Sequence, residues 1–190
     1  GGHAGVEAAF VASRMGAKVC LITIDTNKIG EMSCNPAIGG IGKGHIVREI
    51  DALGGLMPIS ADYSGIQFKV LNSSKGPAVR GPRCQADRKL YKSSIQSQIY
   101  KQKGLKVISG VVKSLKIRKN QCLGVELENG ESIYAGSVIL TTGTFLNGKI
   151  YIGNEKISAG RIKEQASNSL GLFLQSLELQ MARLKTGTPP

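Results

Sequence analysis

The chain has 190 residues, 41% of them hydrophobic, so it can form a hydrophobic core and is long enough for one domain or slightly more. Its formal net charge of +12 favours a polyanionic partner, although a solvated basic surface is the alternative interpretation. No apolar run approaches the roughly 18 residues needed to cross a bilayer. No signal peptide is visible, so we expect no membrane association.

The cysteine pattern indicates neither a zinc site nor a disulfide framework. The four cysteines are widely separated, form no C-x-x-C pair and do not cluster with His3 or His45. We therefore expect no metal, a reducing compartment and a cytoplasmic location. An organellar location stays open, because the natural N-terminus is expected to be missing. The cysteines are Cys20, Cys34, Cys84 and Cys122.

The first ten residues, GGHAGVEAAF, contain most of a dinucleotide-binding glycine loop. Gly2 and Gly5 match the second and third glycines of G-x-G-x-x-G. The first glycine of that pattern and its strand would precede Gly1, so we expect the chain to be a fragment. Apolar residues at helical spacing predict a helix over residues 4–15 directly after the loop.

The next segments continue an α/β order. A continuous apolar run predicts a strand over 18–24, buried on both faces of a parallel sheet, with Cys20 in the core. Asp25 is the only acid close to its end, and whether it meets a cofactor ribose is left open. Residues 33–45 predict a flexible glycine-rich loop, and residues 46–53 a short helix.

Further along the chain the hydrophobic period changes. A helix is predicted over 84–103, and alternating apolar residues predict a three-stranded antiparallel meander over 111–135, closed by an Asn-Gly turn. A buried strand is predicted over 137–143 and a helix near 169–179. Because the chain stops at Pro189-Pro190 without a closing element, we expect its C-terminal side to be cut as well.

Basic residues concentrate between Lys69 and Lys92, where seven cations accompany the single acid Asp87. Such an excess lacks neutralising partners within the segment and favours phosphate contacts. Pro77 and Pro82 stiffen the backbone around the two central arginines. A salt-bridged structural loop is the alternative. The cations are Lys69, Lys75, Arg80, Arg83, Arg88, Lys89 and Lys92.

The order of elements resembles the FAD-binding domain of glutathione-reductase-type flavoproteins. We therefore expect a Rossmann-like α/β fold, with a parallel sheet and a three-stranded antiparallel meander. The longer motifs are similar to those of the MnmG family, also called GidA, and they cover essentially the whole chain in order. They are GGHAGVEAA, MSCNPAIGGIGKGH, EIDALGG, LNSSKGPAVRGPRCQADR, TTGTFLNGKIYIG and RLKTGTPP.

The resemblance implies an FAD-dependent tRNA modification enzyme. Enzymes of this family build an aminomethyl-type group, carboxymethylaminomethyl, on carbon 5 of the wobble uridine, with a folate one-carbon donor and NADH. It also implies an MnmE-type GTPase partner and a homodimer within a heterotetramer. Two other classes stay open: a flavin oxidoreductase acting on a small substrate, and a non-catalytic nucleic-acid-binding fragment.

The resemblance also implies roles for individual residues. The FAD residues would be Gly1, Gly2, His3, Ala4, Gly5, Val112 and Ser167. For Ser167, helix capping is an equally good reading, and His3 could be a first-turn helix residue packed against the loop. Cys34 is the candidate catalytic thiol, with a small packed side chain as the alternative.

The candidates for tRNA binding are Lys69, Lys75, Arg80, Arg83 and Arg88. We expect residues 1–145 to form an N-terminally truncated FAD-binding domain. Residues 146–190 would then begin the following substrate or insertion region.

Overall fold

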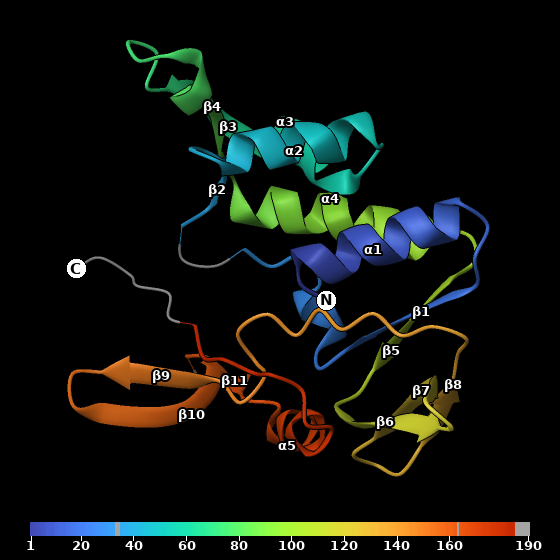
Figure 1. Cartoon of the computed structure of the whole chain (residues 1–190). Helices are drawn as coiled ribbons and strands as arrows, with labels where there is room; N and C mark the ends of the chain where they lie inside the picture. The colour runs from blue at the N-terminus through green and yellow to red at the C-terminus, as the bar shows by residue number, and fades with distance from the viewer. Residues whose placement is uncertain (33–34, 163, 185–190) are drawn as a thin grey trace. The chain divides into compact units, whose positions relative to one another are not determined.

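The computed structural model describes residues 1–32, 35–162 and 164–184 (Figure 1). These residues fall into two compact units, and each is described by itself. Unit 1 comprises residues 1–110 with 139–141, and unit 2 comprises 111–138 with the chain from 142 onward. These compact units do not test the domain boundary expected at residue 145. That boundary stays a prediction.

Unit 1 contains a parallel strand pair, an antiparallel sheet and four α-helices among its described residues. Its helices and strands are α1 (His3–Arg14), β1 (Val19–Thr23), η1 (Thr26–Lys28), β2 (Ala37–Gly39), α2 (Lys43–Ala52), α3 (Leu56–Ser64), β3 (Gly65–Leu71), η2 (Pro77–Val79), β4 (Gly81–Ala86), α4 (Arg88–Lys101) and β5 (Leu105–Ser109).

Helix α1 begins at the glycine loop and forms where the sequence predicts a helix. Its buried residues include Val6, Ala9, Phe10 and Ser13, which recur at helical spacing and form one face. The helix ends just before Gly16, whose φ of 96° is a left-handed conformation that suits glycine.

Strands β1 and β5 pair in parallel, as expected for 18–24, but Cys20 is exposed. The prediction that Cys20 is buried in the core is wrong. Alternation places Cys20 on the face opposite the buried Leu21, beside its register partner Lys106, which is also exposed. In unit 1, α1 and α4 pack on the pair of strands β1 and β5. They cover only the face of the pair on which Leu21 lies.

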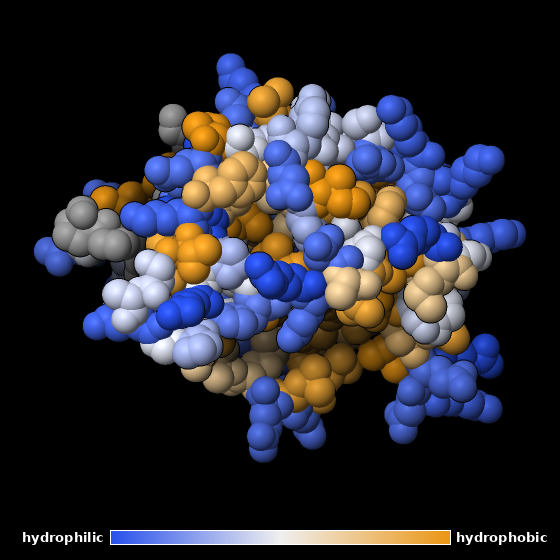
Figure 2. Space-filling view, turned by 90° about the horizontal axis from the view of Figure 1, so that it is seen from above, coloured by the Kyte–Doolittle hydropathy of each residue, from blue (hydrophilic) through white to orange (hydrophobic). Residues whose placement is uncertain are grey.

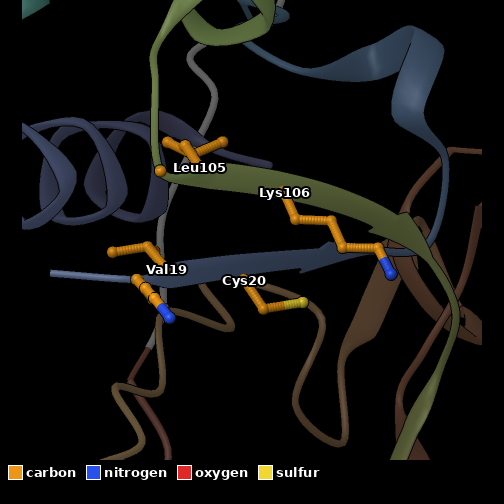
Figure 3. A pocket seen from close by; sticks show the side chains of 6 residues that line it. Val19, Cys20, Leu105 and Lys106 are labelled. Atoms are coloured by element: carbon orange, nitrogen blue, oxygen red, sulfur yellow. The ribbon is translucent and has the colours of Figure 1, made fainter.

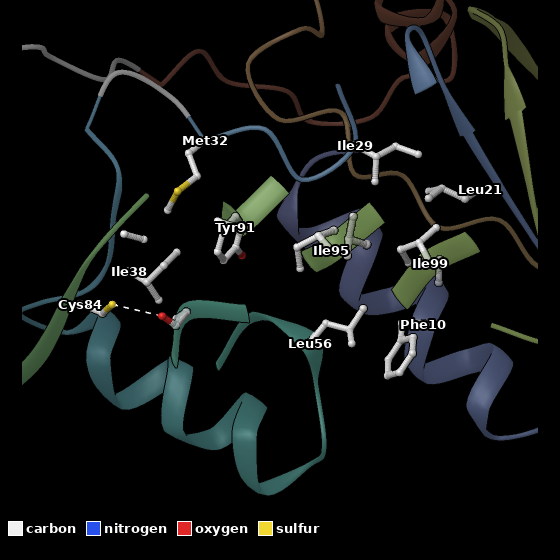
Figure 4. Packing of buried hydrophobic residues seen from close by; sticks show 14 residues of the cluster. Phe10, Leu21, Ile29, Met32, Ile38, Leu56, Cys84, Tyr91, Ile95 and Ile99 are labelled. Atoms are coloured by element: carbon white, nitrogen blue, oxygen red, sulfur yellow. Dashed lines mark hydrogen bonds between the residues drawn. The ribbon is translucent and has the colours of Figure 1, made fainter. Parts of the chain in front are cut away.

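The core of unit 1 lies between α1, α3, α4 and β1 (Figure 4). Helix α4 contributes Tyr91, Ile95 and Ile99, all at most 1% exposed and spaced four residues apart. They pack among Phe10 of α1 and Leu56 of α3. Burial of each such side chain stabilises the fold by about 1.5–3 kcal/mol, so this cluster holds the three helices together.

The helix predicted over 84–103 is wrong in its first residues. Gly81–Ala86 is strand β4, the central strand of an antiparallel sheet ordered β2-β4-β3. Helix α4 begins only after Asp87, whose Oδ1 accepts hydrogen bonds from the backbone N–H groups of Lys89 and Leu90. This cap fixes the start of the helix and leaves the preceding residues to pair with β3.

The glycine-rich run predicted as a flexible loop forms strand β2 and the first turn of α2, in the part from residue 37 onward. Its backbone packs against β4: the N–H of Gly40 donates to the carbonyl of Pro82 at 2.8 Å. A Cβ atom at Gly44 would lie 2.7 Å from the same carbonyl oxygen, and one at Gly39 would collide with it too. The glycines therefore allow backbone to approach backbone.

Unit 2 contains the meander, a second antiparallel sheet and one helix in the described residues. Its elements are β6 (Val112–Arg118), β7 (Gln121–Leu127), β8 (Ser132–Tyr134), β9 (Lys149–Ile152), β10 (Glu155–Arg161), β11 (Glu164–Gln165) and α5 (Asn168–Ser176).

The predicted meander is confirmed as the sheet β6-β7-β8, with antiparallel pairing throughout. Asn129-Gly130 forms the expected turn, with Gly130 at a φ of 86°. The first hairpin turns at Lys119 and Asn120, which both have positive φ and were not singled out from the sequence. The strand predicted over 137–143 does not form, because no described strand pairs with that run.

The last described helix, α5, packs against β6 within unit 2 and confirms a helix close to the predicted span. The β9–β10 hairpin that precedes it was not predicted. None of the described helices combines the length and apolar character of a membrane span.

Candidate functional site

The glycine loop presents the start of α1 without a side-chain cap. Gly2 is the N-cap residue, with φ −75° and ψ 176°, and its carbonyl accepts from the N–H of Val6 at 3.0 Å. A helix start leaves its first N–H groups without intrahelical acceptors, and with the helix dipole it favours anions. A Cβ atom at Gly2 would meet no atom within 4 Å, so the space beside this backbone is open.

Gly1 and Gly5 serve a different purpose, because a side chain at either would collide with its neighbours. A Cβ at Gly1 would lie 2.5 Å from Thr23 Oγ1, and one at Gly5 would lie 2.7 Å from Thr141 Oγ1. The loop thus has close packing at two glycines and open space at the one between them. This is the steric pattern of a pyrophosphate loop, so the residues fit the phosphate end of a dinucleotide cofactor.

His3 and Ala4 form the first turn of α1, directly after Gly2. Ala4 is exposed, and His3 is half-buried. The His3 ring meets the ring of Tyr91 edge to face, with centroids 5.7 Å apart. His3 thus packs against Tyr91 of α4, and whether it contacts a cofactor stays a prediction.

Asp25 follows the end of β1, where a ribose-binding acid is expected. Its Oδ1 accepts a hydrogen bond from the N–H of Asn27 at 2.8 Å and caps η1. Asp25 is half-buried. Contact with a ribose stays a prediction.

Val112 and Ser167 belong to unit 2, whereas Gly1–Gly5 belong to unit 1. Val112 opens β6, an edge strand of the meander, so main-chain groups on its outer side have no strand partner within that sheet. Ser167 is the buried N-cap residue of α5, but its side chain makes no capping hydrogen bond. Ser167 therefore stands at the cap position, but its hydroxyl does not cap the helix.

Cys34 lies outside the described residues, so its catalytic role stays a prediction. Cys84 is buried and its Sγ donates to the carbonyl of Ala61 at 3.4 Å. Burial, followed by the nearby Asp62 carboxylate, raises the pKa of the Cys84 thiol. This thiol is suited to packing rather than to nucleophilic chemistry.

The basic candidates gather on the hairpin of β3 and β4 with its connecting loop, residues 65–86, here called the basic hairpin. Lys69 and Arg83 are direct cross-strand partners. Lys75 and Arg80 lie on the loop, where Arg80 Nε donates to the Lys75 carbonyl at 3.0 Å. Arg83 Nη2 donates to Gln85 Oε1 at 3.1 Å. The Arg80 side chain is exposed, whereas the Arg83 side chain is half-buried.

Three cations of the segment, Arg88, Lys89 and Lys92, lie on α4 rather than on the basic hairpin. Arg88 donates to the carbonyl of Met32 at 2.9 Å, and Lys92 pairs with Glu31 at 3.0 Å. Lys92 is therefore neutralised by an acid from outside the segment, Glu31. Within the described ranges, no carboxylate forms an ion pair with Lys69, Lys75 or Arg80.

Unit 1 also has a shallow pocket at the amino ends of β1 and β5 (Figure 3). In open α/β sheets, ligands bind outside the carboxyl ends of the strands, so this pocket is on the wrong side for the cofactor. Its lining residues are Lys18, Val19, Cys20, Gly104, Leu105 and Lys106.

Apolar side chains also reach the surface. In the view of Figure 2 they lie as separate groups between hydrophilic ones. Ile66, Phe68 and Val70 of β3 alternate along that edge strand and are more than half exposed.

Sequence reasoning missed two residues that join α1 to neighbouring helices. Tyr91 contacts His3, and Glu7 accepts hydrogen bonds from the first N–H groups of α3. The helical stripe of Tyr91, Ile95 and Ile99 could have identified Tyr91 as buried. No local signal identifies Glu7, because its partners lie 49 and 50 residues away.

Comparison with known proteins extends over the whole chain. The family model "Glucose inhibited division protein A" matches residues 1–190. The chain is 54% identical over 189 residues to the "tRNA uridine 5-carboxymethylaminomethyl modification enzyme MnmG" of Zymomonas mobilis. That match covers 100% of the chain and 30% of the Zymomonas protein, so the chain spans less than a third of its relative.

Two crystal forms of Aquifex aeolicus GidA are similar in structure, each with a TM-score of 0.93 and 48% identity. Each match covers 99% of the chain and 31% of the Aquifex protein. A GidA-related protein from Thermus thermophilus shares the fold alone, at 16% identity and a TM-score of 0.60, over 93% of the chain and 64% of that protein. The expected α/β fold class, with parallel and antiparallel sheets, is thus confirmed, and the chain belongs to the GidA family.

Proposed function

We propose that the protein containing this chain is an FAD-dependent tRNA modification enzyme. It adds a carboxymethylaminomethyl group to carbon 5 of the wobble uridine. The observation that carries the proposal is the 54% identity, over the whole chain, to the Zymomonas enzyme of that name. Because the chain covers 30% of that relative, the activity is proposed for the whole protein.

FAD binding is supported by the glycine loop of unit 1. Open space beside Gly2 admits a pyrophosphate, and the first turn of α1, including His3 and Ala4, offers N–H groups to it. Bound FAD would supply two-electron redox chemistry. On the family resemblance, Val112 and Ser167 remain proposed FAD residues, and Cys34 the proposed catalytic thiol.

Binding of tRNA is supported by the charges of the basic hairpin. Lys69 and Arg83 lie directly opposite each other, and like charges in that position destabilise a strand pair. A phosphate between them would relieve the repulsion, and Lys75 and Arg80 extend the positive surface along the loop. Arg88, at the start of α4, completes the proposed set.

The co-substrates and partners are proposed on the family resemblance. They are NADH as reductant, a folate one-carbon donor, an MnmE-type GTPase, and a homodimer within a heterotetramer. The proposed location is the cytoplasm, where the proposed tRNA substrate is available.

The test is Gly2→Val in the complete protein that contains this chain. The backbone angles of Gly2 suit any residue and a Cβ there meets nothing, so the variant should fold while its side chain occupies the phosphate position. We expect it to lose flavin absorbance and wobble-uridine modification. Gly76→Val is the matched control for flavin absorbance alone, since Gly76 is also an N-cap residue in extended conformation with open space beside it.

The outcomes also separate the alternatives. Full flavin content in Gly2→Val contradicts the proposed loop. A wild-type protein with flavin but no salt-sensitive tRNA binding favours an oxidoreductase acting on a small substrate. A wild-type protein that binds tRNA without any flavin favours a non-catalytic nucleic-acid-binding protein.

A further inference from the structure

Strands β9 and β10 form a hairpin in unit 2 (Figure 1), and its two faces differ in chemistry. Tyr151 and Lys156 are direct cross-strand partners, and so are Lys149 and Ser158. Direct partners in an antiparallel pair share a face, as do residues two apart along one strand. These four residues therefore lie on one face of the hairpin, here called the tyrosine–lysine face.

The opposite face of the hairpin is apolar. Ile150 pairs with Ile157, and Ile152 pairs with Glu155. Glu155 is the only acid between residues 149 and 158, so alternation places it away from the tyrosine–lysine face. An apolar partner would bury the isoleucines, whereas the tyrosine–lysine face offers two cations and one aromatic ring. This combination is complementary to an anion that carries flat rings.

The Tyr151 ring is open to solvent, with 58% of the residue exposed. The ammonium of Lys156 is 5.9 Å from the ring centroid, within the range of a cation–π contact. Lys149 and Lys156 are both exposed, and no carboxylate in the described part of the chain forms an ion pair with either. Phe145 differs, because its ring is half-buried and packs where a Cβ atom at Gly160 would collide with it. Packing thus explains the position of Phe145 but not the exposure of Tyr151.

We propose that the tyrosine–lysine face binds unpaired RNA: Tyr151 stacks on a base, and Lys149 and Lys156 contact the adjoining phosphates. Proteins that bind single strands combine aromatic rings for the bases with cations for the backbone. Bases in loops leave their faces free for such stacking, whereas bases in a duplex do not. The inference rests on the proposed function, because the RNA is the proposed tRNA substrate, whose wobble base lies in an unpaired loop.

The test compares two RNAs bound to the complete protein that contains this chain: an anticodon stem–loop and a fully paired duplex of equal length. Tyr151→Leu keeps an apolar side chain but removes the aromatic face. We expect it to raise the stem–loop Kd about tenfold and to leave the duplex Kd unchanged. Tyr151→Phe retains the ring and should bind the stem–loop like the wild type.

Tyr100→Leu is the matched control, because Tyr100 is also 58% exposed but has no cation over its ring among the described residues. It should change neither Kd. Lys156→Ala provides an independent measurement, since loss of one phosphate contact should reduce the slope of log K against log salt by about 1.

Equal stem–loop Kd values for Tyr151→Leu and the wild type overturn the inference, and so does an equal loss for both RNAs. A changed oligomeric mass in Tyr151→Leu with unchanged RNA binding assigns the face to a protein contact and also overturns it. A wild-type protein that binds neither the stem–loop nor complete tRNA contradicts the proposed function itself. Wild-type binding that Tyr151→Leu and Lys156→Ala leave intact overturns only the role of the hairpin.

Discussion

The carboxylate of Glu7 on α1 accepts a hydrogen bond from the backbone N–H of Leu56, the first residue of α3, at 2.9 Å. Its second oxygen accepts from the N–H of Met57 at 2.5 Å. The N-cap residue of α3 is Gly55, which has no side chain to do this. A neighbouring helix thus supplies the cap and places a negative charge at a helix N-terminus, where it is favourable.

We predict that Glu7→Gln lowers the free energy of unfolding by about 1–2 kcal/mol, because charged hydrogen bonds to two helix N–H groups are weakened. Urea denaturation followed by circular dichroism measures the change. Glu49→Gln, at an exposed position of α2, is the control and should have little effect. Equal midpoints for Glu7→Gln and wild type would show that the cap is dispensable.

Gly5→Ala should destabilise the protein by about 1–3 kcal/mol through overpacking, because its Cβ would lie 2.7 Å from Thr141 Oγ1. Gly2→Ala should leave the thermal midpoint close to that of the wild type, because the space beside Gly2 is open. Thermal unfolding of both variants checks the contrast. The interpretation of the loop fails if Gly2→Ala is the more damaging change.

Thiol labelling should separate Cys84 from Cys20. Cys84 is buried and its pKa is raised, so little thiolate is available to a maleimide at about pH 7.5, whereas Cys20 is exposed. We expect Cys20 to be modified first and Cys84 only under denaturing conditions, as read from peptide masses. Equal rates for the two cysteines in the native protein would contradict the packing of β4 against α3.

Stability should fall at alkaline pH because of Tyr91. Its pKa is raised in the folded state, so above the unfolded value of about 10 the unfolded chain releases a proton that the folded protein retains. The contribution is therefore intact below about pH 9 and is lost as the pH rises further, by at most about 1.4 kcal/mol per pH unit. Urea midpoints between pH 8 and 11 should fall more steeply for wild type than for Tyr91→Phe. Parallel curves would be evidence against a strongly buried phenol.

The tRNA proposal predicts that Arg80→Ala and Arg83→Ala lower tRNA affinity at low salt and leave the flavin spectrum unchanged. Each lost phosphate contact should reduce the slope of log K against log salt by about 1, for all tRNA sequences alike. Lys92→Ala is the control, because Lys92 is already paired with Glu31. Loss of flavin with intact tRNA affinity would assign the arginines to the cofactor site. If neither flavin content nor tRNA affinity changes, the arginines are solvent-exposed residues without a binding role.

The elements that the sequence predicts well are those determined by local patterns. The meander combines apolar alternation with an Asn-Gly turn, and α1 combines a helical stripe with flanking glycines. Both patterns lie within short stretches of chain. The glycine loop was recognised for the same reason, since its spacing is contained in residues 1–5.

The features that were missed depend on residues far apart in the chain. Gly81–Ala86 is a strand because β2 and β3 pair with it, and the run over 137–143 is not one because no described strand does. Cys20 is exposed because unit 1 covers only one face of its strand pair. The contact of Tyr91 with His3 joins positions 88 residues apart, which no periodicity can reveal.

The absence of space around Gly39 and Gly44 affects how mutations in this part of the chain are read in genetic screens. A side chain at either position would push β2 or α2 away from the Pro82 carbonyl and so distort the base of the basic hairpin. Such a mutant would lose the proposed tRNA modification although no reacting group had been removed. A loss-of-function mutation at Gly39 or Gly44 therefore indicates a disturbed backbone contact. The folding of such a mutant has to be measured before its loss of activity is attributed to catalysis.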